Sequence, residues 1–319
     1  MKAVVWTRYG SPDVLQQQDY EKPTPKDNEV LVKVHAASIN SWDWELLSGR
    51  GKINLGGLLK PPYKILGCDV AGTVEGVGRN VTCFRPGDEV FGDLCRDGWG
   101  GFAEYVCARG TSLSLKGTGL SFEQAAAIPQ AASLALQSLR DKGKIRSGQR
   151  VLINGAGGGV GTFAVQIAKS FGAEVTGVDR AEKLDMLLSL GADHVVDYAK
   201  EDFTRRGQEY DLIVDVMSHR SVFDYKRALA PKGICVLVGG SGGAVFQSLI
   251  LGSWALGNRK VTLLLYKPNP LDLARICDII EAGKVVPVID KRYMLSEVAD
   301  AFRYFAEGNA KGKVVVTVQ

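Results

Sequence analysis

The fold of this chain is decided by one stretch, residues 151–161, which reads VLINGAGGGVG. It begins with a short apolar run of the kind that forms a buried strand. Glycines follow at once, and apolar residues then recur at helical spacing as far as Phe171, with Gly172 as a stop signal. A second apolar run, residues 174–178, leads to Asp179. The stretch therefore predicts a strand–turn–helix–strand unit that ends in an acid about twenty residues after the glycines.

This arrangement is typical of a dinucleotide-binding site. Glycine has no Cβ, so the backbone can approach a pyrophosphate, and the free N–H groups at a helix N-terminus favour its negative charge. Read strictly, the fingerprint is A-x-G-x-x-G at Ala156, Gly158 and Gly161. The alternative is a glycine-rich turn without a ligand, which the flanking strands and the acid disfavour. The loop residues predicted to bind the cofactor are Ala156, Gly158, Gly159 and Val160.

Composition limits the class of protein. The chain has 319 residues, which is natural for two domains. Its 45% hydrophobic and 23% charged content is ordinary for a soluble globular protein. A net charge of +4 gives no reason to expect nucleic acid or an anionic membrane as partner, and no stretch reads as a signal peptide or a membrane span. The six cysteines are scattered without a C-x-x-C pair, so we expect reduced thiols and a cytoplasmic protein.

The first predicted domain is rich in short strands. In residues 1–118, strand-like runs alternate with Gly and Pro turns such as RPGDEV at 85–90, a spacing that favours a partly open barrel. The tail, residues 271–319, has two amphipathic helices and a closing strand, and it is expected to return to this domain. The first domain is thus predicted to be discontinuous and to comprise residues 1–118 and 267–319.

Residues 119–266 form the second predicted domain. At its start, Ser121 fits a capping box that opens a helical pattern. Beyond Asp179, helices and strands alternate until six strands are complete, which is the number in a full doubly wound parallel sheet. In the helix after Asp179, Leu184, Leu187 and Leu188 are expected to face inward.

Several further motifs resemble one known superfamily over the full length of the chain. Besides the glycine loop they are SINSWD at 38–43, GCDVAG at 67–72, FRPGDEV at 84–90, GFAEY at 101–105 and LGADHVVDY at 190–198. With them the chain resembles the medium-chain dehydrogenase/reductase superfamily, and within it the zinc-free quinone oxidoreductase and enoyl-reductase-like branch. The resemblance implies an α/β protein with a GroES-like β-barrel catalytic domain and a Rossmann domain whose doubly wound parallel sheet has six strands.

The resemblance also implies zinc-independent hydride transfer from NAD(P)H to a quinone or an α,β-unsaturated carbonyl. Where metal-dependent members of the superfamily hold catalytic zinc, this chain carries Asn40, Cys68 and Gln130. Asn and Gln are poor zinc ligands, and one thiolate alone cannot complete a tetrahedral site. We therefore predict no metal site. The cofactor supplies the difficult chemistry, and the protein supplies position and polarity.

The predicted catalytic residues are Asn40, Trp42 and Tyr63. The resemblance suggests that Asn40 hydrogen-bonds near the nicotinamide or the substrate oxygen; the alternative is a turn residue bonded to its own backbone. Trp42, Trp44 and Tyr63 could form an apolar wall for a flat substrate, or they could serve packing. Where some enoyl reductases place a proton-donating tyrosine, this chain has the region of Lys52. Either water supplies the proton or the substrate is a quinone that needs no placed donor.

The cofactor is predicted to be NAD(P)H, and the choice between its two forms stays open. Asp179 should accept hydrogen bonds from the ribose hydroxyls of NADH and repel a 2′-phosphate. The resemblance favours NADPH instead, and Arg180 and Lys183 could clamp its phosphate if Asp179 swings away. The other predicted cofactor contacts are Gln130, Tyr198, Met217, Val238, Gly239 and Gly240.

Two functions from different classes are compatible with these patterns. One is the oxidoreductase, and the other is an NAD(P)H-binding protein of the same fold with little turnover and a structural or regulatory role. The missing tyrosine keeps the second open, as does Leu134 at a position where relatives often have a threonine that contacts the nicotinamide. In both cases the expected partner is a small molecule, with no nucleic acid and no membrane insertion. The apolar run 261–265 is expected to pair with its copy in a homodimer.

Overall fold

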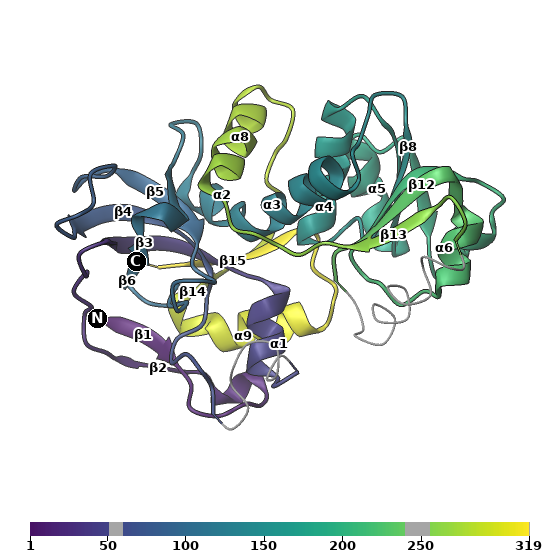
Figure 1. The fold of residues 1–319 in the computed structure, drawn as a ribbon. Helices are drawn as coiled ribbons and strands as arrows, with labels where there is room; N and C mark the ends of the chain where they lie inside the picture. Colours follow the sequence, from purple (N-terminus) through teal and green to yellow (C-terminus); the bar gives the residue numbers. More distant parts are fainter. Residues whose placement is uncertain (51–59, 240–255, 319) are drawn as a thin grey trace. The chain divides into compact units, whose positions relative to one another are not determined.

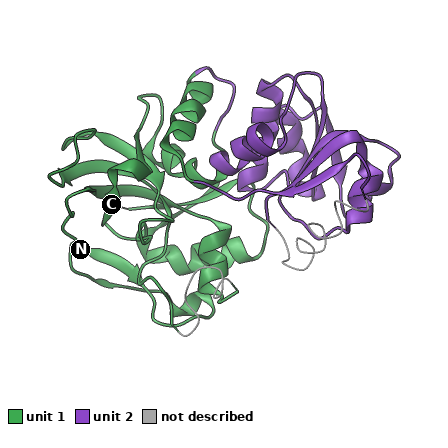
Figure 2. Ribbon diagram, in the orientation of Figure 1, with its two compact units in different colours: residues 1–131, 268–281, 287–319 green, residues 132–267, 282–286 purple. Residues whose placement is uncertain are grey.

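The structure, a computed structural model, describes residues 1–50, 60–239 and 256–318. Contacts divide the chain into two compact units, which Figure 2 draws in different colours. Unit 1 comprises Met1–Ala131, Pro268–Glu281 and Pro287–Gln319, and unit 2 comprises Ala132–Lys267 and Ala282–Val286. These bounds differ from the predicted domain bounds: unit 1 extends beyond residue 118 to Ala131, and the short segment 282–286 belongs to unit 2.

Unit 2 is built on a parallel sheet of six strands in the order β10-β9-β8-β11-β12-β13. The strands are β8 (Arg150–Asn154), β9 (Glu174–Asp179), β10 (His194–Asp197), β11 (Tyr210–Asp215), β12 (Leu229–Leu237) and β13 (Lys260–Leu263). Renumbered in chain order within the sheet, this is the arrangement 3-2-1-4-5-6 of a dinucleotide-binding doubly wound sheet. The predicted fold class of this half of the chain is confirmed.

Helices cover both sides of this sheet, with α4 and α5 on one side and α6 on the other (Figure 1). The α-helices that lie wholly in unit 2 are α4 (Gly159–Ser170), α5 (Ala181–Ser189) and α6 (Val222–Ala228), and α3 (Pro129–Gln137) begins in unit 1 and ends in unit 2. A π-helical turn, η3 (Ser138–Lys142), follows α3, and a 3-10 turn, η4 (Phe203–Arg205), precedes β11. The core between these layers is apolar, with Leu152, Val178 and Ile213 fully or almost fully buried.

The predicted inward face of α5 was partly wrong. Leu187 is buried, but Leu188 is 46% exposed, and Lys183 is only 6% exposed. Residues four apart lie on the same face of a helix, whereas successive residues are rotated by about 100°. Lys183 therefore shares the buried face with Leu187, and Leu188 points to solvent. This places a lysine under the carboxyl end of β9, close to Asp179.

Unit 1 contains a sheet of seven strands in the order β14-β15-β3-β4-β5-β7, with β6 paired to β3, and a separate pair β1-β2. The strands are β1 (Lys2–Val5), β2 (Gln16–Asp19), β3 (Glu29–Ile39), β4 (Asp69–Val77), β5 (Glu89–Asp93), β6 (Tyr105–Arg109), β7 (Leu113–Leu115), β14 (Ile289–Met294) and β15 (Lys313–Thr317). The helices are α1 (Ser41–Leu47), α2 (Phe122–Ala126), α8 (Pro270–Glu281) and α9 (Val298–Ala306), with 3-10 turns η1 (Pro12–Val14), η2 (Gly110–Ser112) and η5 (Leu295–Glu297).

The tail contributes two strands to unit 1 and not one. The predicted closing strand is β15, which pairs antiparallel with β3 and parallel with β14. β14 was not predicted, because its sequence IDKRYM is polar and has no buried residue.

The capping box predicted at Ser121 is confirmed: its hydroxyl accepts from the N–H of Gln124, and its own N–H donates to the side chain of Gln124.

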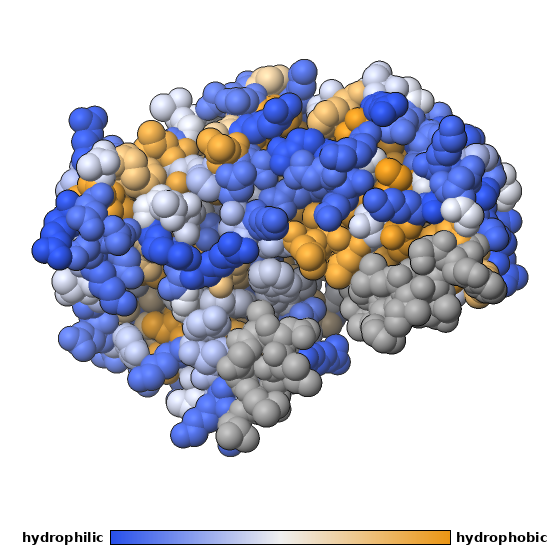
Figure 3. All heavy atoms as spheres, viewed as in Figure 1, coloured by the Kyte–Doolittle hydropathy of each residue, from blue (hydrophilic) through white to orange (hydrophobic). Residues whose placement is uncertain are grey.

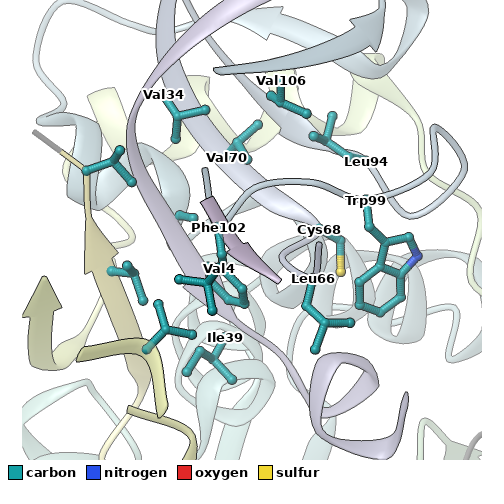
Figure 4. Packing of buried hydrophobic residues seen from close by; sticks show 14 of the residues in the cluster. Val4, Val34, Ile39, Leu66, Cys68, Val70, Leu94, Trp99, Phe102 and Val106 are labelled. Carbon is teal, nitrogen blue, oxygen red and sulfur yellow. The ribbon is translucent and has the colours of Figure 1, made fainter. Parts of the chain in front are cut away.

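The core of unit 1 brings distant segments together. Figure 4 shows Val4, Val70 and Phe102 packed together, with Cys68 beside Leu66 and Trp99. On the face seen in Figure 3, hydrophilic residues are interspersed with smaller apolar patches. Within the described ranges, no helix has the length and apolar character needed to cross a bilayer.

The turn from β8 into α4 requires glycine at two points. Gly155 has φ +80°, in the left-handed region that favours glycine. A Cβ on Gly161 would lie 2.2 Å from the carbonyl oxygen of Gly155 and 2.5 Å from the backbone of Ala156. The first turn of α4 thus packs directly on the loop that it follows.

We predict that Gly161→Ala lowers the free energy of unfolding by about 1–3 kcal/mol, because a backbone contact cannot yield as a side chain can. Gly158→Ala in the same loop is the control, since its Cβ would meet nothing closer than 3.6 Å. Urea denaturation of both variants measures the effect. Equal stability of the two variants would contradict the proposed contact.

Candidate active site

The glycine loop of unit 2 leaves room at the N-terminus of a helix. Gly158 is the N-cap residue of α4, with extended backbone angles. Among the described residues, the nearest atom to a Cβ added at Gly158 is 3.6 Å away, so none of them requires glycine there. Gly158, Gly159 and Val160 are partly exposed, whereas Ala156 is fully buried. The first N–H groups of a helix have no partner within it and favour negative charge, so these residues fit the diphosphate of a dinucleotide.

Asp179 has partners on both carboxylate oxygens. Oδ2 accepts from the N–H of Gly157 at 2.7 Å, and Oδ1 accepts from the N–H of Arg180 at 2.9 Å. The Nζ atom of Lys183 lies 3.7 Å from Oδ1, and Asp179 and Lys183 are each only 6% exposed. The acid at the end of β9 therefore ties the glycine loop to the sheet, and a neighbouring ammonium offsets its charge.

Two further predicted cofactor residues meet at the end of β10. The Nε atom of Arg180 donates to the hydroxyl of Tyr198 at 2.6 Å, and both side chains are exposed. The Tyr198 backbone N–H donates to the carbonyl of Asp179 at 3.2 Å. Arg180, Tyr198 and Asp179 therefore lie together at one end of the sheet.

The ends of β11 and β12 bring together another predicted group. The N–H of Ser218 donates to the carbonyl of Gly239 at 3.3 Å, and Met217, 54% exposed, precedes Ser218. Val238 donates its N–H to the carbonyl of the last residue of β11 at 2.9 Å. Met217, Val238 and Gly239 thus share one edge of the sheet. Gly240 lies outside the described residues.

A buried acid that the sequence analysis missed holds this edge in place. Oδ1 of Asp215 accepts from Nδ2 of Asn154 at 2.9 Å and from the N–H of Met217 at 3.0 Å, and Oδ2 accepts from the hydroxyl of Tyr225 at 2.9 Å. Burial raises the pKa of Asp215 above its ordinary value. The sequence did carry a signal for this residue: Asp215 ends the apolar run of β11, and ligands bind at the carboxyl ends of such strands.

Unit 1 brings together the three residues that the resemblance places where metal-dependent members of the superfamily hold zinc. Nε2 of Gln130 lies 3.8 Å from Sγ of Cys68, and the N–H of Gln130 donates to Asp69 at 3.1 Å. Oδ1 of Asn40 accepts from Nζ of Lys313 at 2.5 Å. Lys313 also lies 3.5 Å from Oδ2 of Asp69, and all five residues are buried. We call these five residues the polar cluster.

Asp43 is a further buried acid that contacts two members of the polar cluster, Asn40 and Cys68. Its carboxylate accepts from the N–H of Asn40 at 2.8 Å and from the N–H of Gly67 at 2.9 Å, and Cys68 Sγ lies 3.9 Å away. Asn40 is the N-cap residue of α1, and Asp43 is its partner three residues on. The carboxylate thus joins the end of β3 to the segment that leads into β4.

Burial dominates the ionisation of this region. Desolvation raises the pKa of Asp43 to about 7, and it raises that of Asp69 to about 7 although the Lys313 ammonium opposes the shift. Burial, with the nearby carboxylates, raises the pKa of the Cys68 thiol well above its ordinary value. A neutral buried thiol is a poor nucleophile.

No group of three or more His, Cys, Asp or Glu side chains among the described residues is placed to hold a metal ion. That finding does not test the predicted absence of zinc, which stays a prediction. Two histidines make side-chain contacts of a structural kind. His35 Nε2 lies 3.0 Å from Thr73 Oγ1, and His194 Nε2 lies 2.8 Å from a carboxylate oxygen of Glu174.

The predicted aromatic wall lies against the core of unit 1. Tyr63 stacks on Trp99 with ring centroids 5.7 Å apart, and Trp42 and Trp44 pack against the same core while partly buried. Packing therefore accounts for much of the surface of these rings. The region of Lys52, where relatives carry a tyrosine, lies outside the described residues. The roles of Asn40, Trp42 and Tyr63 in catalysis stay predictions.

Comparison with known proteins identifies the family. The family model of the alcohol dehydrogenase GroES-like domain matches residues 26–116, and that of the zinc-binding dehydrogenase matches residues 190–316. The chain is 35% identical to 2-methylene-furan-3-one reductase of Solanum lycopersicum, over 99% of this chain and 79% of that protein. The chain belongs to the medium-chain dehydrogenase/reductase superfamily, in its quinone oxidoreductase-like branch, as predicted.

Solved structures agree with this assignment. The quinone oxidoreductase from Coxiella burnetii has a TM-score of 0.91 and 30% identity, covering 100% of this chain and 99% of that one. The Escherichia coli quinone oxidoreductase complexed with NADPH has a TM-score of 0.86 and 25% identity, covering 99% and 100%. The predicted fold, a GroES-like domain with a six-stranded Rossmann sheet, is confirmed, and the chain is an NAD(P)H-dependent oxidoreductase.

We predict that Asp43→Asn changes how stability depends on pH. An acid whose pKa is raised to about 7 in the folded state binds a proton that the unfolded chain releases near pH 4, so folding gains stability as the pH falls from 7 towards 4. The variant lacks this gain, and the stability lost by Asp43→Asn should grow over that window. Urea denaturation at pH 8, 6 and 4.5 measures it; a constant difference would refute the raised pKa.

Proposed function

We propose that this protein is a zinc-independent oxidoreductase that transfers hydride from NAD(P)H to a quinone or an α,β-unsaturated carbonyl. The observation that carries the proposal is the open glycine loop at Gly158, at the N-terminus of α4 and at the carboxyl end of the first strand of the dinucleotide-binding sheet. Relatives named as quinone oxidoreductases, and one named as a reductase of a methylene-furanone, support this class of substrate. The alternative of a binding protein with little turnover is not favoured.

The chain's own residues bind the cofactor and place a polar group at the reacting oxygen. When bound, the reduced nicotinamide supplies the hydride. The N–H groups of the first turn of α4 hold the diphosphate, and Asp179 keeps the preceding loop in place through Gly157. In unit 1, Asn40 offers an amide to the reacting oxygen. We assign the proton that follows the hydride to water.

Zinc is disfavoured at the polar cluster by charge. Where a metal-dependent relative would use ligand lone pairs, Oδ1 of Asn40 already accepts from the ammonium of Lys313, and Gln130 directs Nε2 towards Cys68 Sγ. Cys68 is the one ligand of the three that zinc prefers, and a single thiolate does not complete a tetrahedral site. A divalent cation would have to displace a buried lysine. These contacts support a metal-free reaction.

We predict that the purified protein oxidises NADPH when quinones or enones are added, as followed by loss of reduced-nicotinamide absorbance. Gly158→Ala should lower kcat/KM at least tenfold without changing the free energy of unfolding, because its Cβ would meet the ligand and lies at least 3.6 Å from every described protein atom. Gly119→Ala, whose Cβ has no atom of the described residues within 4 Å, is the matched control and should retain full activity. Tight cofactor binding with no turnover across the panel would instead support the binding-protein alternative.

We further propose that the cofactor is NADPH. Lys183 offsets the charge of Asp179, whose oxygens are already engaged by backbone N–H groups, so the acid is less able to repel a 2′-phosphate. Arg180 and Tyr198 lie beside it and could hold the phosphate. The relative complexed with NADPH supports the same choice.

The test compares dissociation constants of NADPH and NADH by fluorescence. Arg180→Met should weaken NADPH about tenfold, or ~1.4 kcal/mol, and leave NADH unchanged, because only NADPH carries the 2′-phosphate. Arg227→Met, which removes an equal charge from α6, is the control. Tighter binding of NADH than NADPH by the wild type would show that Asp179 selects against the phosphate.

The homodimer and the cytoplasmic location stay predictions. Among the described strands, β13 ends the sheet of unit 2 and pairs with β12 alone, which is compatible with pairing to a second copy. The expected partner is a small-molecule substrate.

A further inference from the structure

Lys313 is a buried lysine whose contacts centre on Asn40. It opens β15, is 3% exposed, and donates from Nζ to the carbonyl of Ile39 at 3.2 Å and to Oδ1 of Asn40 at 2.5 Å. Oδ2 of Asp69 lies 3.5 Å away and balances its charge. A buried ammonium needs such partners, because burial of an unpaired charge is costly. The lysine reaches Asn40 from 273 positions along the chain.

This contact orients the carboxamide of Asn40. An ammonium has only donors, so the atom that faces it must be the carbonyl oxygen Oδ1, and the NH₂ group must take the other side. Nδ2 lies near the Asp69 carboxylate and helps to lower the pKa of that acid. Its distances and angles to the described residues nevertheless do not satisfy those of a hydrogen bond. It is one of three buried side-chain atoms in the described ranges without a hydrogen-bond partner. Such donors are rarely left unpaired without a reason.

The charge of Lys313 also strengthens the donor. A hydrogen bond from an ammonium to the oxygen of an amide polarises the amide and makes its N–H groups better donors. A better donor is useful where negative charge develops, as it does on the oxygen of a quinone or an enone that accepts hydride.

We infer that Lys313 is a positioning residue that fixes the Asn40 carboxamide so that Nδ2 donates to the carbonyl oxygen of the substrate. The inference rests on the proposed function, since it takes a quinone or an enone as the substrate. It chooses between the two ligands predicted for Asn40, the nicotinamide and the substrate oxygen, in favour of the latter. Lys313 touches neither ligand and acts through Asn40.

The test is a double-mutant cycle in the full-length protein, with 1,4-naphthoquinone as acceptor. Asn40→Ala and Lys313→Met should each lower kcat at least tenfold, and the double variant should lose no more than the worse single variant, because both changes remove one interaction. Lys313→Arg should restore part of the activity, since it keeps a charged donor. Lys311→Met, an exposed neighbour, is the matched control and should leave kcat unchanged.

Two measurements separate this role from a purely structural one. Asn40→Asp keeps the shape and the oxygen that faces Lys313 but replaces the Nδ2 donor by a carboxylate oxygen, so it should lose kcat while the protein still unfolds in one cooperative transition. The dissociation constant of NADPH should be unchanged in all the variants. Losses that multiply in the double variant, or a weakened NADPH affinity in Asn40→Asp, would overturn the inference. A wild type without turnover would refute the proposed function itself.

Discussion

The close approach of α4 to the end of β8 is the constraint on which the cofactor half of the protein depends. The backbone of Gly161 packs against Gly155 and Ala156 so tightly that a methyl group has no space. This contact sets where α4 begins, and with it the direction of the N–H groups in its first turn. Ala156 can replace the first glycine of the fingerprint because its methyl group is fully buried within the protein.

Asp179, the acid that ends the dinucleotide-binding motif, has a structural role as well as the expected role in binding. In the fingerprint, an acid at the end of the second strand serves to bind ribose hydroxyls. Here Asp179 is tied to Gly157 and Arg180 and is partnered by Lys183, so its first task is to hold the loop. The same residue type at the same spacing can therefore support either cofactor, and its neighbours decide which.

In unit 1, a buried ammonium lies next to Asn40. Lys313 supplies positive charge next to Asn40, and the carboxylate of Asp69 balances that charge. A buried charge needs such a partner. Asp43 then fixes the backbone of Asn40 and Gly67 around this pair. A fixed charge of this kind polarises a neighbouring amide without binding an ion, and it is set permanently by the fold.

The sequence alone determined the βαβ unit, the six-stranded doubly wound sheet and the family, because these depend on local periodicity and on motifs with fixed spacing. It also singled out Asn40, Cys68 and Gln130, which the resemblance places where other members of the superfamily hold zinc. Only the tertiary structure revealed Lys313 beside Asn40, Lys183 beside Asp179, and the polar strand β14. The first of these contacts spans 273 positions, and no local pattern marks a lysine as buried when its partners come from other strands. Charge compensation in a core is a property of the assembled fold.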